Sequence, residues 1–125
     1  MNKSVPNSLA QSYEETIVEI ILDDHEMQGL GWAEYFLITA WNPFSQKLTV
    51  TENLRRNELL LEDLRTLGAE SMRAIGRSPD WEWFEESFAV KKISLELVVD
   101  LAKKYEQNAI FQINLGVRKV ISCLD

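Results

Sequence analysis

Few of the residues that build disulfides, metal centres or membrane spans are present in this sequence. Its 125 residues include 1 cysteine and 1 histidine, so an internal disulfide cannot form and no Cys/His cluster for zinc is available. No apolar run approaches the roughly 18 to 20 residues that cross a bilayer, and the first residues lead into no apolar signal-peptide core. We therefore expect a cytoplasmic protein with no membrane contact, no structural metal and no cofactor.

Basic residues are also scarce. Lys and Arg total 13 against 20 Asp and Glu, which gives a formal net charge of −7. This charge repels phosphate backbones, and the phosphate-cradling patterns GxGxxG and GxxxxGK followed by Ser or Thr are absent. Nucleic-acid binding would require a local basic patch, and a nucleotide site has little support.

The remaining composition is that of an ordinary globular domain. Hydrophobic residues make up 46% of the chain, with 4 Trp, 5 Phe and 3 Tyr. This length and composition predict a single domain over 1–125, which buries roughly two thirds of the surface that its unfolded chain exposes. Residues 1–7 are expected to form a flexible end.

Short β-branched and aromatic runs predict strands, and longer stretches of helix formers predict helices. The strands are expected at 16–22, 34–40, 70–75, 83–91, 109–114 and 117–124. The helices are expected at 50–66 and from Ser94 through Tyr105, with a weaker helical tendency at 8–15. Because the polar loop 23–32 contains two glycines, the first two strands are predicted to form a hairpin.

The order of these elements is β-β-α-β-β-α-β-β. Strands joined mostly by hairpins favour antiparallel pairing, and two helices are enough to cover one face of the sheet. We therefore predict an α+β fold. It is a two-layer sandwich with a mainly antiparallel sheet of about five or six strands, two main helices packed on it and an extra N-terminal helix.

The helix at 50–66 carries the strongest local signals. Thr49 and Glu52 fit a capping box, and Gly68 can end the helix in the left-handed conformation. Spacings of four and three residues place one set of side chains on its inner face: Asn53, Asn57, Leu60, Leu64 and Leu67. In the last helix the corresponding face holds Leu95, Val98, Leu101, Ala102 and Tyr105. Two asparagines thus occupy apolar-face positions of the first helix.

Polar side chains also gather where the second strand ends. Thr39 and Asn42 follow this strand, and Asn42 precedes a proline, which starts a turn near the N-terminus of the helix. Together with Arg56 and the two helix asparagines, these groups are placed to line a small polar pocket. The alternative is that Asn42 and Thr49 only form a turn and a helix cap.

Glu86 lies in an otherwise apolar row. Alternation over 84–90 puts it on the same face as Phe88 and puts Glu85 on the opposite face. A carboxylate in an apolar row must be paired, hydrogen-bonded or neutral, and Arg56 or the helix asparagines would be its partners. Either Glu86 serves a ligand pocket, or it forms a structural ion pair or turns outward at a bulge.

Trp81 and Trp83, followed by Phe84, form the densest aromatic cluster. Tryptophans pack most often in cores, whereas an exposed pair is a natural binding hot spot. We expect one of the two to be packed and the other to be exposed. His25 lies in an acidic loop without a triad motif, and Cys123 is expected to pack in a strand.

Several ordered motifs resemble one known pattern. They are Thr39-Ala40-Trp41-Asn42-Pro43, Glu52-Asn53, Arg56-Asn57, Pro79-Asp80-Trp81, Glu85-Glu86-Ser87-Phe88 and Tyr105-Glu106-Gln107-Asn108. Their order resembles a bacterial family of domains of unknown function, numbered 3293, over about residues 35–112. The resemblance implies no settled activity, but it directs attention to the polar members of the motifs and adds Gln107 and Asn108 to the site.

The leading hypothesis is a pocket at the sheet edge that binds a small polar or anionic ligand, with Arg56 as anion clamp and Glu86 as orienter or base. The predicted site comprises Thr39, Asn42, Asn53, Arg56, Asn57, Glu86, Gln107 and Asn108. The alternative is an acidic module that docks a protein partner through Trp81 and Trp83 in the segment 79–84. The sequence assigns no reaction, and a monomer or a homodimer fits it equally.

Overall fold

The computed structural model describes residues 15–20 and 32–124 of the chain. In chain order these residues form β1 (Ile17–Ile20), β2 (Glu34–Ile38), the short 3-10 turn η2 (Pro43–Ser45), α2 (Val50–Thr66), β3 (Glu70–Arg77), β4 (Phe84–Lys91), α3 (Leu95–Lys104), β5 (Ala109–Asn114) and β6 (Val117–Ser122). The predicted flexible end, most of the predicted N-terminal helix, and the acidic loop with His25 lie outside the described residues.

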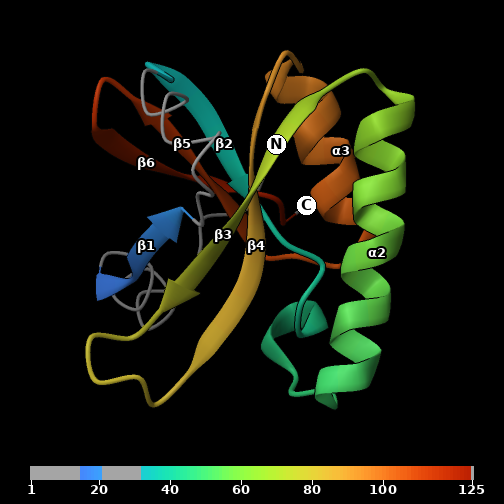
Figure 1. Cartoon of the computed structure of the whole chain (residues 1–125), viewed down its shortest axis with the longest axis vertical. Coiled ribbons are helices and arrows are strands. Elements are labelled where there is room, and N and C mark those ends of the chain that lie inside the picture. Colours follow the sequence, from blue (N-terminus) through green and yellow to red (C-terminus); the bar gives the residue numbers. More distant parts are fainter. Residues whose placement is uncertain (1–14, 21–31, 125) are drawn as a thin grey trace.

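The described strands form one six-stranded sheet in the order β1-β3-β4-β2-β5-β6, and every neighbouring pair is antiparallel. The sheet is strongly twisted, and helices α2 and α3 lie side by side against one of its faces (Figure 1). The predicted α+β architecture, with an antiparallel sheet and two main helices, is therefore confirmed. No helix in the described part of the chain combines the length and apolar character needed to cross a membrane.

The predicted hairpin between the first two strands is wrong. Strand β1 pairs with β3 at one edge of the sheet, whereas β2 lies between β4 and β5. The burial of the two strands explains this difference. Phe36, Leu37 and Ile38 of β2 are consecutive and all buried, so both faces of this strand are covered, as is typical of a central strand. Glu19 of β1 is half exposed, which suits an edge.

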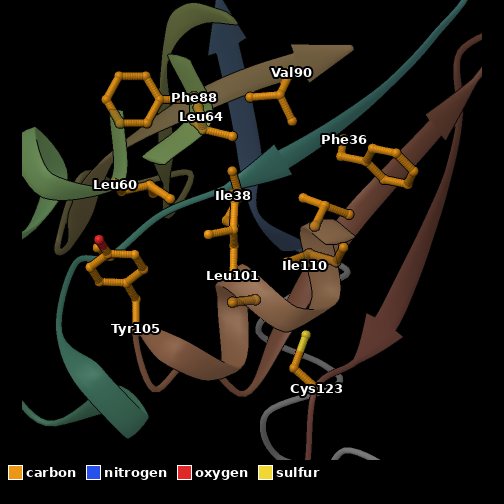
Figure 2. Close-up of a cluster of buried hydrophobic side chains, with 13 residues drawn as sticks. Phe36, Ile38, Leu60, Leu64, Phe88, Val90, Leu101, Tyr105, Ile110 and Cys123 are labelled. Atoms are coloured by element: carbon orange, nitrogen blue, oxygen red, sulfur yellow. The ribbon is translucent and has the colours of Figure 1, made fainter. Parts of the chain in front are cut away.

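The main core lies between the sheet and the two helices (Figure 2). It takes Phe36 and Ile38 from β2, Leu60 and Leu64 from α2, and further residues from β4, α3 and β5. The predicted inner faces of both helices are confirmed in their middle turns. Leu67 and Leu95 are exposed, so their predicted burial is wrong. Each lies at a helix end, beyond the stretch that packs on the sheet.

The helix ends follow the local signals in the sequence. The Thr49 hydroxyl accepts a hydrogen bond from the Glu52 amide at 3.1 Å and donates to the Glu52 carboxylate at 2.9 Å. Gly68 has a φ of 76° after the last turn of α2. The Ser94 hydroxyl caps α3 by accepting from the Leu97 amide at 3.1 Å. The Thr49 cap fixes where α2 begins, and therefore which side chains of its first turns face the end of β2.

A second, smaller apolar cluster covers the sheet face opposite the helices. Its buried members are Leu37, Ala74, Ala89, Phe111 and Ile113. The register between β3 and β4 places Gly76 directly opposite Glu85 on this same face, since both alternate with the cluster residues. At this end of the face, Glu85 therefore has no side chain directly opposite it on β3.

Candidate functional site

The segment that follows β2 has an unusual backbone. Asn42, Phe44 and Ser45 have φ values of 45°, 50° and 62°, in the left-handed region that residues other than glycine rarely adopt. Each such residue costs about 1 to 2 kcal/mol relative to a right-handed conformation. Three of them within four positions persist only if the surrounding side chains hold the segment in place.

Asn53 of α2 holds the turn at Asn42. Its side-chain oxygen accepts a hydrogen bond from the Asn42 amide at 2.8 Å, and its side-chain nitrogen donates to the Asn42 side-chain oxygen at 2.8 Å. The same Asn42 oxygen accepts from the Leu48 amide at 3.0 Å. Asn53 is buried, and these bonds satisfy both ends of its carboxamide. The two asparagine side chains are therefore hydrogen-bonded to each other, and this contact stabilises the turn.

Asn57, one turn further along α2, joins β2 to β4. Its oxygen accepts from the Ala40 amide at 2.8 Å, and its nitrogen donates to the main-chain oxygen of Glu86 at 2.8 Å. The Thr39 hydroxyl donates to the same Glu86 oxygen at 2.7 Å and accepts from the Trp41 amide at 3.0 Å. These contacts replace the ladder hydrogen bonds that stop where β2 leaves the sheet.

Arg56 ties this segment to the end of α3. Its Nε donates to the Ala40 carbonyl at 2.7 Å and one terminal nitrogen donates to the Tyr105 carbonyl at 2.5 Å. The other terminal nitrogen lies 3.8 Å from the Glu106 carboxylate. The Arg56 side chain is 22% exposed, and its donors face main-chain oxygens and one carboxylate. Its contacts within the chain are structural, and a role as anion clamp stays a prediction.

Gln107 and Asn108 close the network from the other side. The Gln107 side-chain nitrogen donates to the Trp41 and Tyr105 carbonyls, each at 3.1 Å. The Asn108 nitrogen donates to the Ser45 hydroxyl at 3.0 Å. The structure thus brings together seven of the eight predicted side chains: Thr39, Asn42, Asn53, Arg56, Asn57, Gln107 and Asn108.

Glu86 takes part through its main-chain oxygen alone. Its carboxylate forms an ion pair with Arg73 at 3.0 Å, and the side chain is 27% exposed. The expected pairing of this carboxylate with Arg56 or a helix asparagine is therefore wrong, and the structural ion pair is the alternative that holds. The reason is the register of β3 and β4, which places Arg73 opposite Phe88, diagonal to Glu86 on the same face.

A cavity of about 320 Å³ lies beside the strained segment and is lined by residues of strands β1 to β5 and of the segments around them. Its polar lining comes from Thr16, Thr39, Asn42, Ser45, Glu85, Ser87, Gln107 and Asn108. Its apolar lining comes from Val18, Leu37, Ile38, Gly76, Trp83, Phe84, Ala109, Ile110 and Phe111. Four predicted site residues therefore reach the cavity, whereas Asn53, Arg56, Asn57 and Glu86 do not line it.

Glu85 is the residue in this cavity that sequence reasoning missed. Its side chain is partly buried, and burial raises the pKa of the Glu85 carboxyl to about 7. Alternation along β4 predicted that it faces away from Glu86. Alternation does not predict that Glu85 pairs with Gly76, which also lines the cavity and places no cross-strand side chain beside the carboxylate. A carboxyl with this pKa can hold or release a proton near neutral pH.

Trp83 lines the cavity, and Trp81 lies on the surface outside its lining. Trp81 is 52% exposed and Trp83 is 38% exposed, so the expectation that one of them is packed is wrong. The Arg77 guanidinium lies over the Trp81 ring, 4.3 Å from its centre. Trp83 lines the cavity two positions before Glu85.

The described residues offer little for metal or thiol chemistry. Within 15–20 and 32–124 no three His, Cys, Asp or Glu side chains are grouped so as to hold a metal ion. Cys123 is buried, as predicted for a packing residue. Burial raises the pKa of its thiol to about 11, so the reactive thiolate is scarce at neutral pH.

One family model matches this chain. The family is described as "Protein of unknown function (DUF3293)", and its model matches residues 38–110. The comparisons with curated proteins and with solved structures gave no match. The matched part exceeds half of the 125 residues and contains the whole polar network, the strained segment and Glu85. On this evidence the chain belongs to the DUF3293 family.

Proposed function

We propose that this domain binds a small polar molecule in the cavity beside the strained segment. The observation that carries the proposal is the cavity itself, whose volume of about 320 Å³ falls within the range of small-molecule sites. Its walls are mostly apolar, and a few polar groups from distant parts of the chain converge on it. This combination is typical of sites that bury a ligand's body and orient it through selected atoms.

The strained backbone at the rim supports the same proposal. Asn42 and Ser45, both with positive φ, line the cavity. Backbone strain persists where surrounding contacts over-determine it, and such places concentrate at ligand sites. Here α2 and the residues after α3 provide those contacts through Asn53 and Asn108. The polar network is thus the support that shapes one wall of the pocket.

The charges around the cavity favour a polar ligand over an anionic one. With a pKa of about 7, the Glu85 carboxyl is ionised in part of the molecules at neutral pH, and the ionised form repels a ligand carboxylate or phosphate beside it. Arg56, the cation predicted to clamp an anion, directs its donors to the Ala40 and Tyr105 carbonyls. Binding of an anion would require Arg56 to give up these bonds.

The test is a thermal-shift screen of several hundred metabolites with a variant that fills the cavity. Gly76 has no left-handed φ, and a Cβ there meets Thr16 Cγ2 at 3.6 Å, an ordinary contact. Gly76→Val should therefore fold while it occupies space beside Glu85. Ser71→Val, on the same strand but outside the cavity lining, is the matched control.

A ligand at 100 times its Kd should raise the free energy of unfolding by about 2.7 kcal/mol, which is several degrees in Tm. We expect hits that Gly76→Val abolishes and Ser71→Val retains. Hits retained in both variants would place binding elsewhere, and a screen without hits would count against a ligand site.

A second candidate function is docking of a protein partner through Trp81 and Trp83. Their exposure of 52% and 38% favours it, because exposed tryptophans often dominate binding interfaces. This function predicts that Trp81→Ala removes a co-purified partner and that Arg56→Ala does not. The opposite pattern would exclude it.

A further inference from the structure

Glu85 is the only charged side chain among the described residues that line the cavity. It lies on the sheet face opposite the helices, directly across from Gly76 of β3. Because glycine has no side chain, the carboxylate has no cross-strand neighbour to shield it or to bond with it. The cavity therefore extends up to the carboxylate itself.

The carboxylate has no partner within the described chain. No described side chain or amide donates a hydrogen bond to its oxygens, and the Ser87 hydroxyl reaches only the main-chain oxygen of Glu85, at 3.5 Å. Burial without a partner destabilises the charged form, and burial is the cause of the raised pKa of this group. A partly buried carboxylate in this state has unused capacity for an ion pair.

The arginines of β3 and β6 already have partners: Arg77 with Glu19, Arg73 with Glu86, and Arg118 with the Thr16 carbonyl. Arg118 also lies over the Phe111 ring, 4.8 Å from its centre. Strands β2 and β5 contribute no charged side chain to the described lining. Among the described residues, no cationic side chain lines the cavity beside Glu85, so a positive charge on a ligand would complement this carboxylate.

The remaining lining suits an organic cation rather than a metal ion. Trp83 offers an aromatic ring two positions from Glu85, and rings attract cations that lack a tight hydration shell. Leu37 and Val18 supply hydrocarbon surface, and Thr39 supplies a hydroxyl. A metal ion would need several oxygen or nitrogen ligands close together, whereas Glu85 is the single carboxylate here.

We propose that the pocket selects a small molecule that carries a protonated amine on a hydrocarbon body, with the Glu85 carboxylate as the counter-ion. This inference rests on the proposed ligand-binding function and adds the chemical class of the ligand. The amine pairs with Glu85 across the space left by Gly76, and the hydrocarbon body contacts the apolar wall. The polar rim at Thr39 and Asn42 remains for a further polar group of the ligand.

The experiment uses matched probes that differ in one functional group. Each set has a primary amine, an alcohol and a carboxylate on the same butyl, hexyl or phenethyl skeleton, and binding to the full chain is measured by NMR titration at pH 8. Glu85→Gln removes the charge in the cavity. Glu82→Gln is the matched control, since Glu82 is exposed and lies outside the lining.

We expect at least one amine to bind about tenfold or more tightly than its alcohol, because a charge-assisted bond to a partly buried carboxylate is lost in the alcohol. Glu85→Gln should remove this preference, and Glu82→Gln should keep it. Saturation with the amine should also lower the pKa of the Glu85 carboxyl, read from its 13C chemical shift.

Other outcomes separate the inference from the function on which it rests. If the alcohol binds as tightly as the amine, or if Glu85→Gln keeps the preference, the inference fails and the pocket stands. If both Glu variants weaken the amine equally, general attraction to the acidic chain explains its binding and the inference fails. If no probe binds and the metabolite screen gives no hit sensitive to Gly76→Val, both proposals fail.

Discussion

The two sides of the segment after β2 differ in how their polar groups are satisfied. On the helix side, Asn53, Arg56 and Asn57 direct their side chains to main-chain atoms and to Asn42, with distances of 2.5 to 2.8 Å. On the cavity side, the Glu85 carboxylate has no partner among the described residues and an elevated pKa. The first arrangement stabilises a fold, and the second leaves binding capacity unused. The polar side chains of α2 thus support the fold, while the unpartnered Glu85 carboxylate lies on the opposite face of the sheet.

The largest expected effect comes from removing the Arg56 hydrogen bonds on the helix side. Arg56→Ala leaves the Ala40 and Tyr105 carbonyls without their charged donor, and we expect the free energy of unfolding to fall by about 3 to 5 kcal/mol. Equilibrium urea unfolding measures this loss. Arg55→Ala, at the neighbouring exposed position, should change stability by less than about 0.5 kcal/mol. An Arg56→Ala protein that is as stable as the wild type but has lost a ligand would instead support the anion clamp.

The next largest effect is the pH dependence of stability that the Glu85 carboxyl causes on the cavity side. The Glu85 carboxyl has a pKa of about 7 in the folded protein against an ordinary value of 4.5. Between these values the folded state binds more protons than the unfolded chain, so this group lowers stability as pH rises. Glu85→Gln should therefore be more stable than the wild type by roughly 3 kcal/mol at pH 8, and by little at pH 4. Urea unfolding at both pH values checks this, and equal stability of the two proteins at pH 8 would contradict it.

A smaller effect is expected at Glu86, the neighbour that faces the other way. Its ion pair with Arg73 is partly exposed, so Glu86→Gln should cost less than about 1 kcal/mol. Its main-chain oxygen, which accepts from Thr39 and Asn57, is unchanged by the substitution. High salt should reduce the difference from the wild type further. A loss of several kcal/mol in thermal unfolding would show that the Glu86 carboxylate supports the network.

The smallest effect is expected at Trp81. Its ring contacts the Arg77 guanidinium at an exposed site, so Trp81→Ala should lower stability by about 0.5 to 1 kcal/mol. The amine preference of the cavity should not change, because Trp81 does not line it. Calorimetry and the matched-probe titration test these two statements. Loss of amine binding in this variant would mean that the site extends onto the outer aromatic surface.

How far the sequence predicted this molecule depends on how local each signal is. The bounds of α2 and the burial of Asn53 and Asn57 were predictable, because a cap and a helical period act within a few residues. The pairing of β1 with β3 was not, since it depends on which strand can be covered on both faces. The environment of Glu85 could not be predicted for the same reason. Its environment depends on its cross-strand partner Gly76, nine positions away in sequence and fixed only by register.

The two sides of the segment are compared most directly by urea unfolding at pH 8 of the wild type, Arg56→Ala and Glu85→Gln. If Arg56 supports the fold and Glu85 is an unpartnered carboxylate awaiting a ligand, the two substitutions change stability in opposite directions. Arg56→Ala then lowers the free energy of unfolding and Glu85→Gln raises it. A lower free energy of unfolding in both variants would contradict the account, because Glu85 would then be a stabilising part of the same network.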